Sequence, residues 1–125
     1  MRIEFWAAGQ PVPYNRESAR FGRTHPRNAE WRKAIRTAMF ASGVGPGWPV
    51  AGAVAMTIAF HGARSGCDGD NLSKEVLDAL NGVAYEDDSQ VRRCFWEIAD
   101  WRPRGKRAPA KKAPPGALIV IEVAP

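Results

Sequence analysis

Carboxylates gather in one stretch of this sequence, Cys67–Val91, at spacings that could serve a metal ion. Asp68 and Asp70 stand two residues apart just before a short amphipathic segment, and Asp88 follows the turn that ends it. Taken singly, such residues are commonly helix caps and turn residues. If the three converge, however, their mutual repulsion costs stability unless a cation lies between them. A metal site is therefore the economical explanation of the group.

Ligands that are all oxygen atoms favour Mg²⁺, Mn²⁺ or Ca²⁺ over zinc or copper. An EF-hand is excluded, because counting from Asp68 places the third ligand on Leu72. A few carboxylates that leave waters on the ion suit Mg²⁺ when a phosphate completes its shell, with Mn²⁺ as the alternative. Lys74 follows Asp70 by one helical turn and could orient or deprotonate an attacking water or offset charge in the transition state. An ion pair of Lys74 with Asp70 or Asp78 is the structural alternative, and the two roles are compatible.

Two helices and several strands are expected to position these residues. The helix of the acidic stretch is predicted to have Asp70 as its N-cap and Asn81-Gly82 as its stop. Its buried stripe consists of apolar residues at helical spacing: Leu72, Val76, Ala79 and Leu80. A second helix is predicted over residues 29–42 with Asn28 as N-cap. The predicted strands are residues 1–8, 50–61, 91–101 and 117–123, the last of them buried on both faces. These elements predict an α+β fold, a mixed sheet of about four or more strands with two main helices packed on it.

The 125 residues suffice for one domain, residues 1–125, with 45% apolar and 25% charged residues. No apolar run approaches the length of a membrane span, and the N-terminus lacks the apolar core of a signal peptide, so we expect a cytoplasmic protein. Cys67 and Cys94 are too few for a disulfide framework and are expected to be packing residues.

The net charge of +5 conceals a division between an acidic centre and a basic remainder. Nine of the thirteen acidic residues but three of the eighteen basic residues lie from Asp68 to Asp100, a local net charge of −6 that leaves +11 elsewhere. This segregation suits a protein that holds a polyanion by its phosphates while a cation-loaded site acts on one of them. The candidate DNA contacts are Arg16, Arg20, Arg23 and Arg27 in an aperiodic segment with interleaved aromatic residues, and Lys106, Arg107, Lys111 and Lys112 in a Pro-rich basic loop, 103–116. A solvated surface loop is the alternative for the first group.

Three linked blocks of this sequence resemble the signature of the RusA family of Holliday-junction resolvases. They are Asp68-Gly69-Asp70-Asn71-Leu72 followed by Lys74, then Asp78-Ala79-Leu80-Asn81-Gly82, then Asp87-Asp88-Ser89-Gln90-Val91. The early Gly-Gln-Pro-Val-Pro and the late Lys-Lys-Ala-Pro-Pro-Gly extend the similarity over essentially the whole chain. The resemblance implies a homodimeric, Mg²⁺-dependent endodeoxyribonuclease of DNA recombination and repair. Such an enzyme binds four-way junctions, nicks two opposing strands symmetrically and leaves 5′-phosphates.

The resemblance also implies roles for individual residues. Asp68, Asp70 and Asp88 match the metal-binding catalytic carboxylates of the family, and Lys74 matches its catalytic lysine. Supporting motif positions are matched by Asn71, Asp78, Asp87 and Gln90. The chain departs from the family in its N-terminal segment, Pro-Tyr-Asn-Arg-Glu-Ser-Ala-Arg, which is less basic than in many members. Two alternatives remain open: a non-catalytic junction-binding protein of the same fold, and a nuclease of forks or flaps. Glu75 and Glu86 are expected to be ordinary surface residues.

Overall fold

A four-stranded mixed sheet forms the body of the protein, in a computed structural model that describes residues 1–16, 20–101, 105 and 114–124. The strand order is β1-β4-β2-β3, with bounds β1 (Arg2–Ala8), β2 (Val54–His61), β3 (Val91–Ile98) and β4 (Gly116–Val123). β4 pairs antiparallel with both β1 and β2, whereas β2 and β3 are parallel. Parallel neighbours need a long crossover connection, and the segment between β2 and β3 supplies it with a helix.

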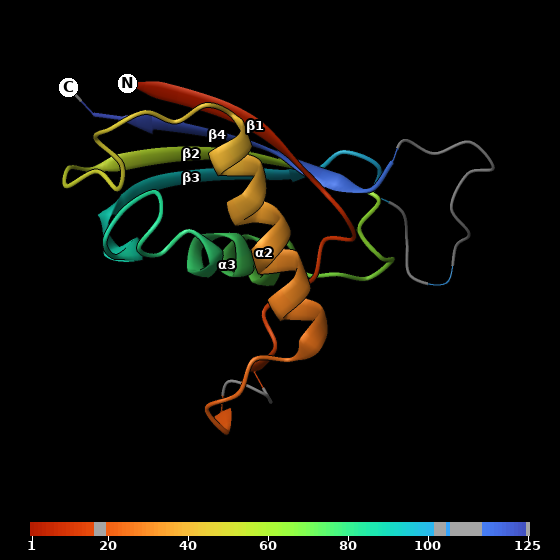
Figure 1. The fold of residues 1–125 in the computed structure, drawn as a ribbon. Coiled ribbons are helices and arrows are strands. Elements are labelled where there is room, and N and C mark those ends of the chain that lie inside the picture. The colour runs from red at the N-terminus through yellow and green to blue at the C-terminus, as the bar shows by residue number, and fades with distance from the viewer. Residues whose placement is uncertain (17–19, 102–104, 106–113, 125) are drawn as a thin grey trace.

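Two helices pack on one side of this sheet (Figure 1), α2 (Pro26–Ala41) and α3 (Gly69–Ala79), and a 3₁₀ turn, η1 (Asp88–Gln90), precedes β3. The predicted α+β architecture is therefore confirmed. Both helices bury the apolar stripes that their spacing predicted: Trp31, Ile35 and Met39 on α2, and Leu72, Val76 and Ala79 on α3. None of the helices in the described ranges is long and apolar enough to cross a membrane.

The opposite face of the sheet is open to solvent across the described residues (Figure 1). It presents large apolar side chains that are 40% exposed at Trp6, 62% at Phe95 and 36% at Leu118. The prediction that the last strand is buried on both faces is wrong, because Leu118 and Glu122 of β4 lie on this open face. Only the face beneath the helices is packed, so each strand alternates between core and solvent.

Both helices begin earlier than predicted. α2 is capped by His25, whose Nδ1 accepts a hydrogen bond from the Arg27 amide (3.2 Å), and Pro26 is the first helical residue, where its missing N–H costs nothing. Asn28, the predicted N-cap, lies inside the helix and is buried. In α3 the N-cap is Asp68 rather than Asp70. Asp70 thus belongs to the first turn of α3, where a negative charge is favourable.

Candidate active site

One side of α3 carries Asp70, Lys74 and Asp78, as their spacing predicted. Lys74 Nζ lies 3.8 Å from Asp78 Oδ2, so the lysine pairs with the later of its two candidate partners. The same ammonium lies 4.7 Å from the centre of the Tyr14 ring, a cation–π contact that fixes its direction. Half of the Lys74 side chain stays exposed, at 49%, and the ammonium is thus held beside a carboxylate yet open to a substrate.

The Asp88 carboxyl lies beside Asp78, the last of these three residues on α3. Burial is the main influence that raises the pKa of the Asp78 carboxyl, and the Asp88 carboxyl beside it adds to the increase. The positive charges of Lys74 and Arg32 oppose these effects. Neighbouring carboxylates repel each other, so a cation beside Asp78 would be stabilising there.

The 3₁₀ turn η1 fixes Asp88 through its neighbours. Gln90 Oε1 accepts hydrogen bonds from the amides of Glu86 (2.9 Å) and Asp87 (3.1 Å). Gln90 Nε2 donates to the carbonyl of Val50 (2.8 Å), forty residues earlier in the chain. The Asp87 carboxylate accepts from the Ser89 amide (3.0 Å), and its hydrogen bonds to Ser89 lower the pKa of Asp87. The motif residues Asp87 and Gln90 thus brace the turn that carries Asp88.

The beginning of α3 explains the Asp-Gly-Asp block. Asp68 Oδ1 accepts a hydrogen bond from the Asp70 amide (2.9 Å), so this carboxylate faces the start of its own helix. A Cβ on Gly69 would overlap the Trp96 ring of β3, so only glycine lets the ring pack against the start of the helix. Asn71 contributes its backbone carbonyl, which accepts from the Tyr14 amide (2.9 Å) and ties the N-terminal loop to α3.

The roles of Asp68, Asp70 and Asp88 as metal ligands stay a prediction. In the structure Asp88 lies beside Asp78, near the end of α3 opposite to Asp70, and Asp68 accepts a hydrogen bond at the start of its own helix. Across the described residues, no three side chains of His, Cys, Asp or Glu form a group that could hold a metal ion. The Asp78–Asp88 pair nevertheless fits Mg²⁺, which binds through one or two carboxylates and keeps several waters.

A buried ion pair beneath the site was missed by sequence reasoning. Glu75, expected on the surface, is 0% exposed and makes two hydrogen bonds with Arg32 of α2, Nη2–Oε1 at 2.8 Å and Nε–Oε2 at 3.0 Å. Asn28 Nδ2 donates to the same carboxylate (2.5 Å), and the hydrogen bonds that Arg32 donates to Glu75 raise the pKa of Arg32. Arg32 Nη2 also lies 3.9 Å from Asp78 Oδ2, so the pair links α2 to the site. The available signal was spacing, because Glu75 lies three residues after Leu72 on the buried stripe.

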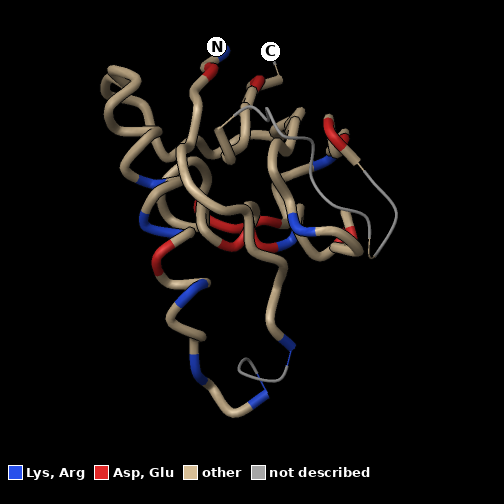
Figure 2. The backbone as a smooth tube through the Cα atoms, turned by 90° about the vertical axis from the view of Figure 1, so that its right-hand side faces the viewer, with Lys and Arg blue, Asp and Glu red and all other residues tan. Residues whose placement is uncertain are grey.

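Basic residues lie around this acidic centre. Figure 2 shows Lys and Arg along α2 and along the projecting loop before it. The four predicted contacts in this region are all exposed: Arg16, Arg20, Arg23 and Arg27. The Phe21 ring lies 5.9 Å from the guanidinium carbon of Arg20 and 5.8 Å from that of Arg23. The other four predicted contacts lie outside the described residues: Lys106, Arg107, Lys111 and Lys112.

Comparison with known protein families identifies the family of this chain. The model of a family described as "Endodeoxyribonuclease RusA" matches residues 8–110, which include α3, η1 and every acidic residue of the candidate site. The chain belongs to the RusA family. No curated protein matches it. Membership makes the chain a junction-resolving endonuclease by family and confirms the resemblance of its three motif blocks.

Proposed function

We propose that this RusA-family chain is a Mg²⁺-dependent endonuclease that resolves four-way DNA junctions in recombination and repair by paired symmetric nicks. The observation that carries the proposal is that Asp70, Lys74 and Asp78 lie on one side of α3 and that Asp88 lies beside Asp78. A surface network that only stabilised the fold would not need the neighbouring carboxyl groups of Asp78 and Asp88 beside a half-exposed lysine. Cleavage is proposed to leave 5′-phosphate and 3′-hydroxyl ends.

Mg²⁺, or Mn²⁺ in its place, is proposed to be held by Asp68, Asp70 and Asp88, which would have to approach one another on binding because the structure shows them as no single group. Asp78, which lies beside Asp88, would be an additional neighbour. When bound, the ion supplies Lewis acidity toward the phosphodiester and makes a bound water more acidic. Lys74 is proposed to hold the attacking water or to offset the negative charge that develops on the phosphate. Asp78 is proposed to orient the Lys74 ammonium through their ion pair.

Junction binding is proposed to use the basic residues around the acidic centre. The exposed Arg16, Arg20 and Arg23 between β1 and α2, together with Arg27 at the start of α2, would contact phosphates. The Phe21 ring near Arg20 and Arg23 offers a surface on which a base can stack. The basic segment 103–116 is proposed to add further phosphate contacts. Binding that rests on phosphate contacts weakens steeply as salt increases.

We propose a homodimer that associates through the open face of the sheet. A four-way junction has approximate two-fold symmetry, and a single site would have to release and rebind the DNA between two nicks. On this face β3 presents Arg93, Phe95 and Glu97 in alternation, an order that complements itself when the second copy is turned by a two-fold axis. Phe95 would then meet Phe95 of the second copy, with each arginine opposite a glutamate.

A junction-cleavage assay tests the catalytic proposal. Labelled four-way junction, replication fork, flap and linear duplex are incubated with the protein and Mg²⁺, and we expect paired nicks on the junction in preference to the other substrates. Asp70→Asn should abolish nicking and leave the electrophoretic shift of the junction intact. Glu86→Gln is the matched control, because it removes an exposed charge of the same segment outside the proposed catalytic residues, and it should nick normally. Junction binding without any cutting, or near-normal cutting by Asp70→Asn, would contradict the assignment.

A further inference from the structure

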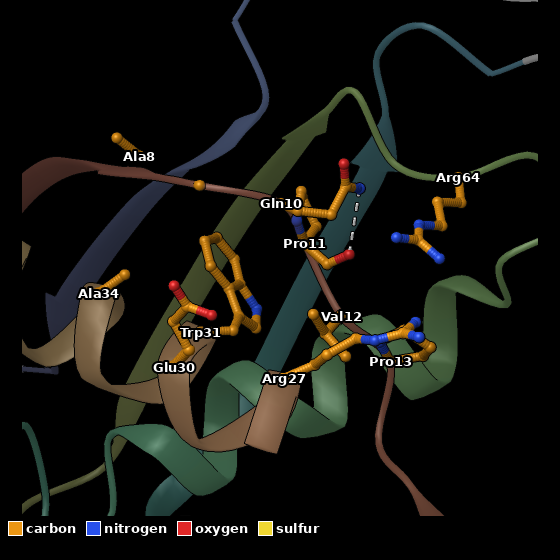
Figure 3. A pocket seen from close by; sticks show the side chains of 11 residues that line it. Ala8, Gln10, Pro11, Val12, Pro13, Arg27, Glu30, Trp31, Ala34 and Arg64 are labelled. Carbon is orange, nitrogen blue, oxygen red and sulfur yellow. Dashed lines mark hydrogen bonds between the residues drawn. The ribbon is translucent and has the colours of Figure 1, made fainter. Parts of the chain in front are cut away.

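A cavity of about 340 Å³ lies beside the candidate active site, and neither Lys74 nor any of the site's aspartates lines it. It is enclosed by the loop after β1, the N-terminal half of α2 and Arg64 (Figure 3). Its apolar walls come from proline, valine, alanine and tryptophan side chains: Pro11, Val12, Pro13, Trp31 and Ala34. This volume falls at the lower end of the range of small-molecule pockets.

The loop wall of this cavity is fixed before any ligand arrives. The Gly9 amide donates to the Pro115 carbonyl (3.1 Å), and Gln10 Nε2 donates to the Gly62 carbonyl (2.9 Å). Asn28 Nδ2 donates to the Pro13 carbonyl (2.9 Å), which attaches the far end of the loop to α2. Two prolines further restrict the backbone of this wall. A ligand would therefore meet a formed pocket and would lose little free energy in ordering it.

A polar donor in the cavity wall lacks a partner. Trp31 is 2% exposed, and its Nε1 has no hydrogen-bond partner among the residues that the structure describes. Figure 3 shows the indole at the middle of the lining residues with its nitrogen on the side toward Val12. A buried N–H without an acceptor costs about 1–3 kcal/mol. The nitrogen has almost no accessible surface, so an acceptor on a ligand would reach it after a small shift of the indole or of Val12 beside it, and the contact would recover that cost.

Charged side chains at the cavity define the ligand chemistry. Arg27 and Arg64 line it and make no ion pair within the described part of the chain, and Glu30 lines it as well. A bare anion would leave the apolar walls unused and would be repelled by Glu30. A hydrocarbon would leave the arginines and the indole N–H without partners. A nucleotide satisfies all of these groups, because its base has flat apolar faces, its edge carries donors and acceptors, and its phosphate binds arginine.

We infer that this cavity binds one nucleotide of a DNA strand, with the base against Val12, Pro13 and the lining edge of Trp31 and the phosphate at Arg27 and Arg64. The inference rests on the proposed function for the source of the nucleotide, an unpaired position at the junction. Drawing a base out of its stack costs a few kcal/mol and costs least where the base is already unpaired. The wall continues directly into Tyr14, whose ring contacts Lys74, so the occupied cavity would hold the strand beside the reacting groups.

Nuclear magnetic resonance of the indole N–H groups tests the cavity without any cleavage. The Trp31→Phe variant identifies the Trp31 signal among the five tryptophans, and the protein is titrated without Mg²⁺ with each deoxynucleoside 5′-monophosphate, with deoxycytidine and with inorganic phosphate. We expect a saturable downfield shift of the Trp31 signal with at least one monophosphate, at an affinity at least tenfold above deoxycytidine or phosphate alone. No shift, or equal binding of phosphate alone, would overturn the inference.

A cavity-filling variant and a DNA substrate complete the test. Ala34→Phe should abolish the shift, whereas Ala41→Phe, at an exposed position of the same helix, should preserve it. Junctions that carry 2-aminopurine at one crossover position at a time should become brighter with wild-type protein at one or more positions and less so with Ala34→Phe. If mononucleotides bind but no junction position responds, the strand assignment is overturned. Mononucleotide binding by a protein that never nicks a junction would remove the proposed function and leave the cavity assignment standing.

Discussion

The buried Arg32–Glu75 pair should respond asymmetrically to mutation, because its two members differ in burial. The Glu75 side chain is 0% exposed, whereas that of Arg32 is 24% exposed and also lies near Asp78. Arg32→Met strands a fully buried carboxylate and should cost about 3–5 kcal/mol of unfolding free energy. Glu75→Gln keeps the shape and leaves a guanidinium that reaches water, so it should cost about 1–3 kcal/mol.

Urea unfolding followed by circular dichroism measures both variants. Arg36→Met is the matched control, since Arg36 lies one turn further along α2 and reaches α3 through a single long hydrogen bond to the Ala79 carbonyl (3.4 Å). It should cost no more than about 1.5 kcal/mol. The double variant Arg32→Met/Glu75→Met removes both charges and should be more stable than Arg32→Met alone. A Glu75→Gln variant as unstable as Arg32→Met, or a double variant no more stable than Arg32→Met, would refute this reasoning.

Three further outcomes follow from the packing. Gly69→Ala should cost about 1–3 kcal/mol in urea unfolding, since the new methyl group overlaps the Trp96 ring, and Gly45→Ala, with open space at its Cβ, is the control. Phe95→Lys should convert dimer to monomer in analytical ultracentrifugation, whereas Phe40→Lys, equally exposed on α2, should not; a dimer that survives Phe95→Lys would contradict the interface. Burial raises the pKa of both the Cys67 and Cys94 thiols, so at pH 8 fewer thiolates exist in the folded protein. Their alkylation should accelerate in urea, and equal rates in both states would be inconsistent with this.

The periodicity of apolar residues was sufficient to predict the strands and helices. It did not predict whether the second face of a strand is covered or open to solvent. The run Ala-Leu-Ile-Val-Ile of β4 is apolar at every position, so it does not distinguish a strand between two layers from one with an open face. The core stripes of α2 and α3 were predictable, because their apolar residues recur at helical spacing. Helix starts were not, because Asp68 is as favourable an N-cap as Asp70, and α2 begins at Pro26, a residue favoured at the first helical position, rather than after Asn28.

The site shows a different limit of sequence reasoning. The side of α3 that carries Lys74 followed from spacing alone. The position of Asp88 did not, because Gln90 is anchored to the Val50 carbonyl at the other end of the β2–α3–β3 segment. The burial of Glu75 also depends on Arg32, which belongs to another helix, and the residues around Glu75 in the sequence do not indicate this partner.

The place of β3 in the sheet has a consequence for how the site opens. Among the described strands β3 pairs with β2 alone, so it is an edge strand, and η1 with Asp88 immediately precedes it. Edge elements can open locally at a fraction of the free energy of global unfolding. Such an opening would carry Asp88 away from Asp78 while the rest of the core stays folded. Any ligand that needs Asp88 would then slow amide hydrogen exchange throughout β3, which makes the exchange rate of this strand a local gauge of whether the site is assembled.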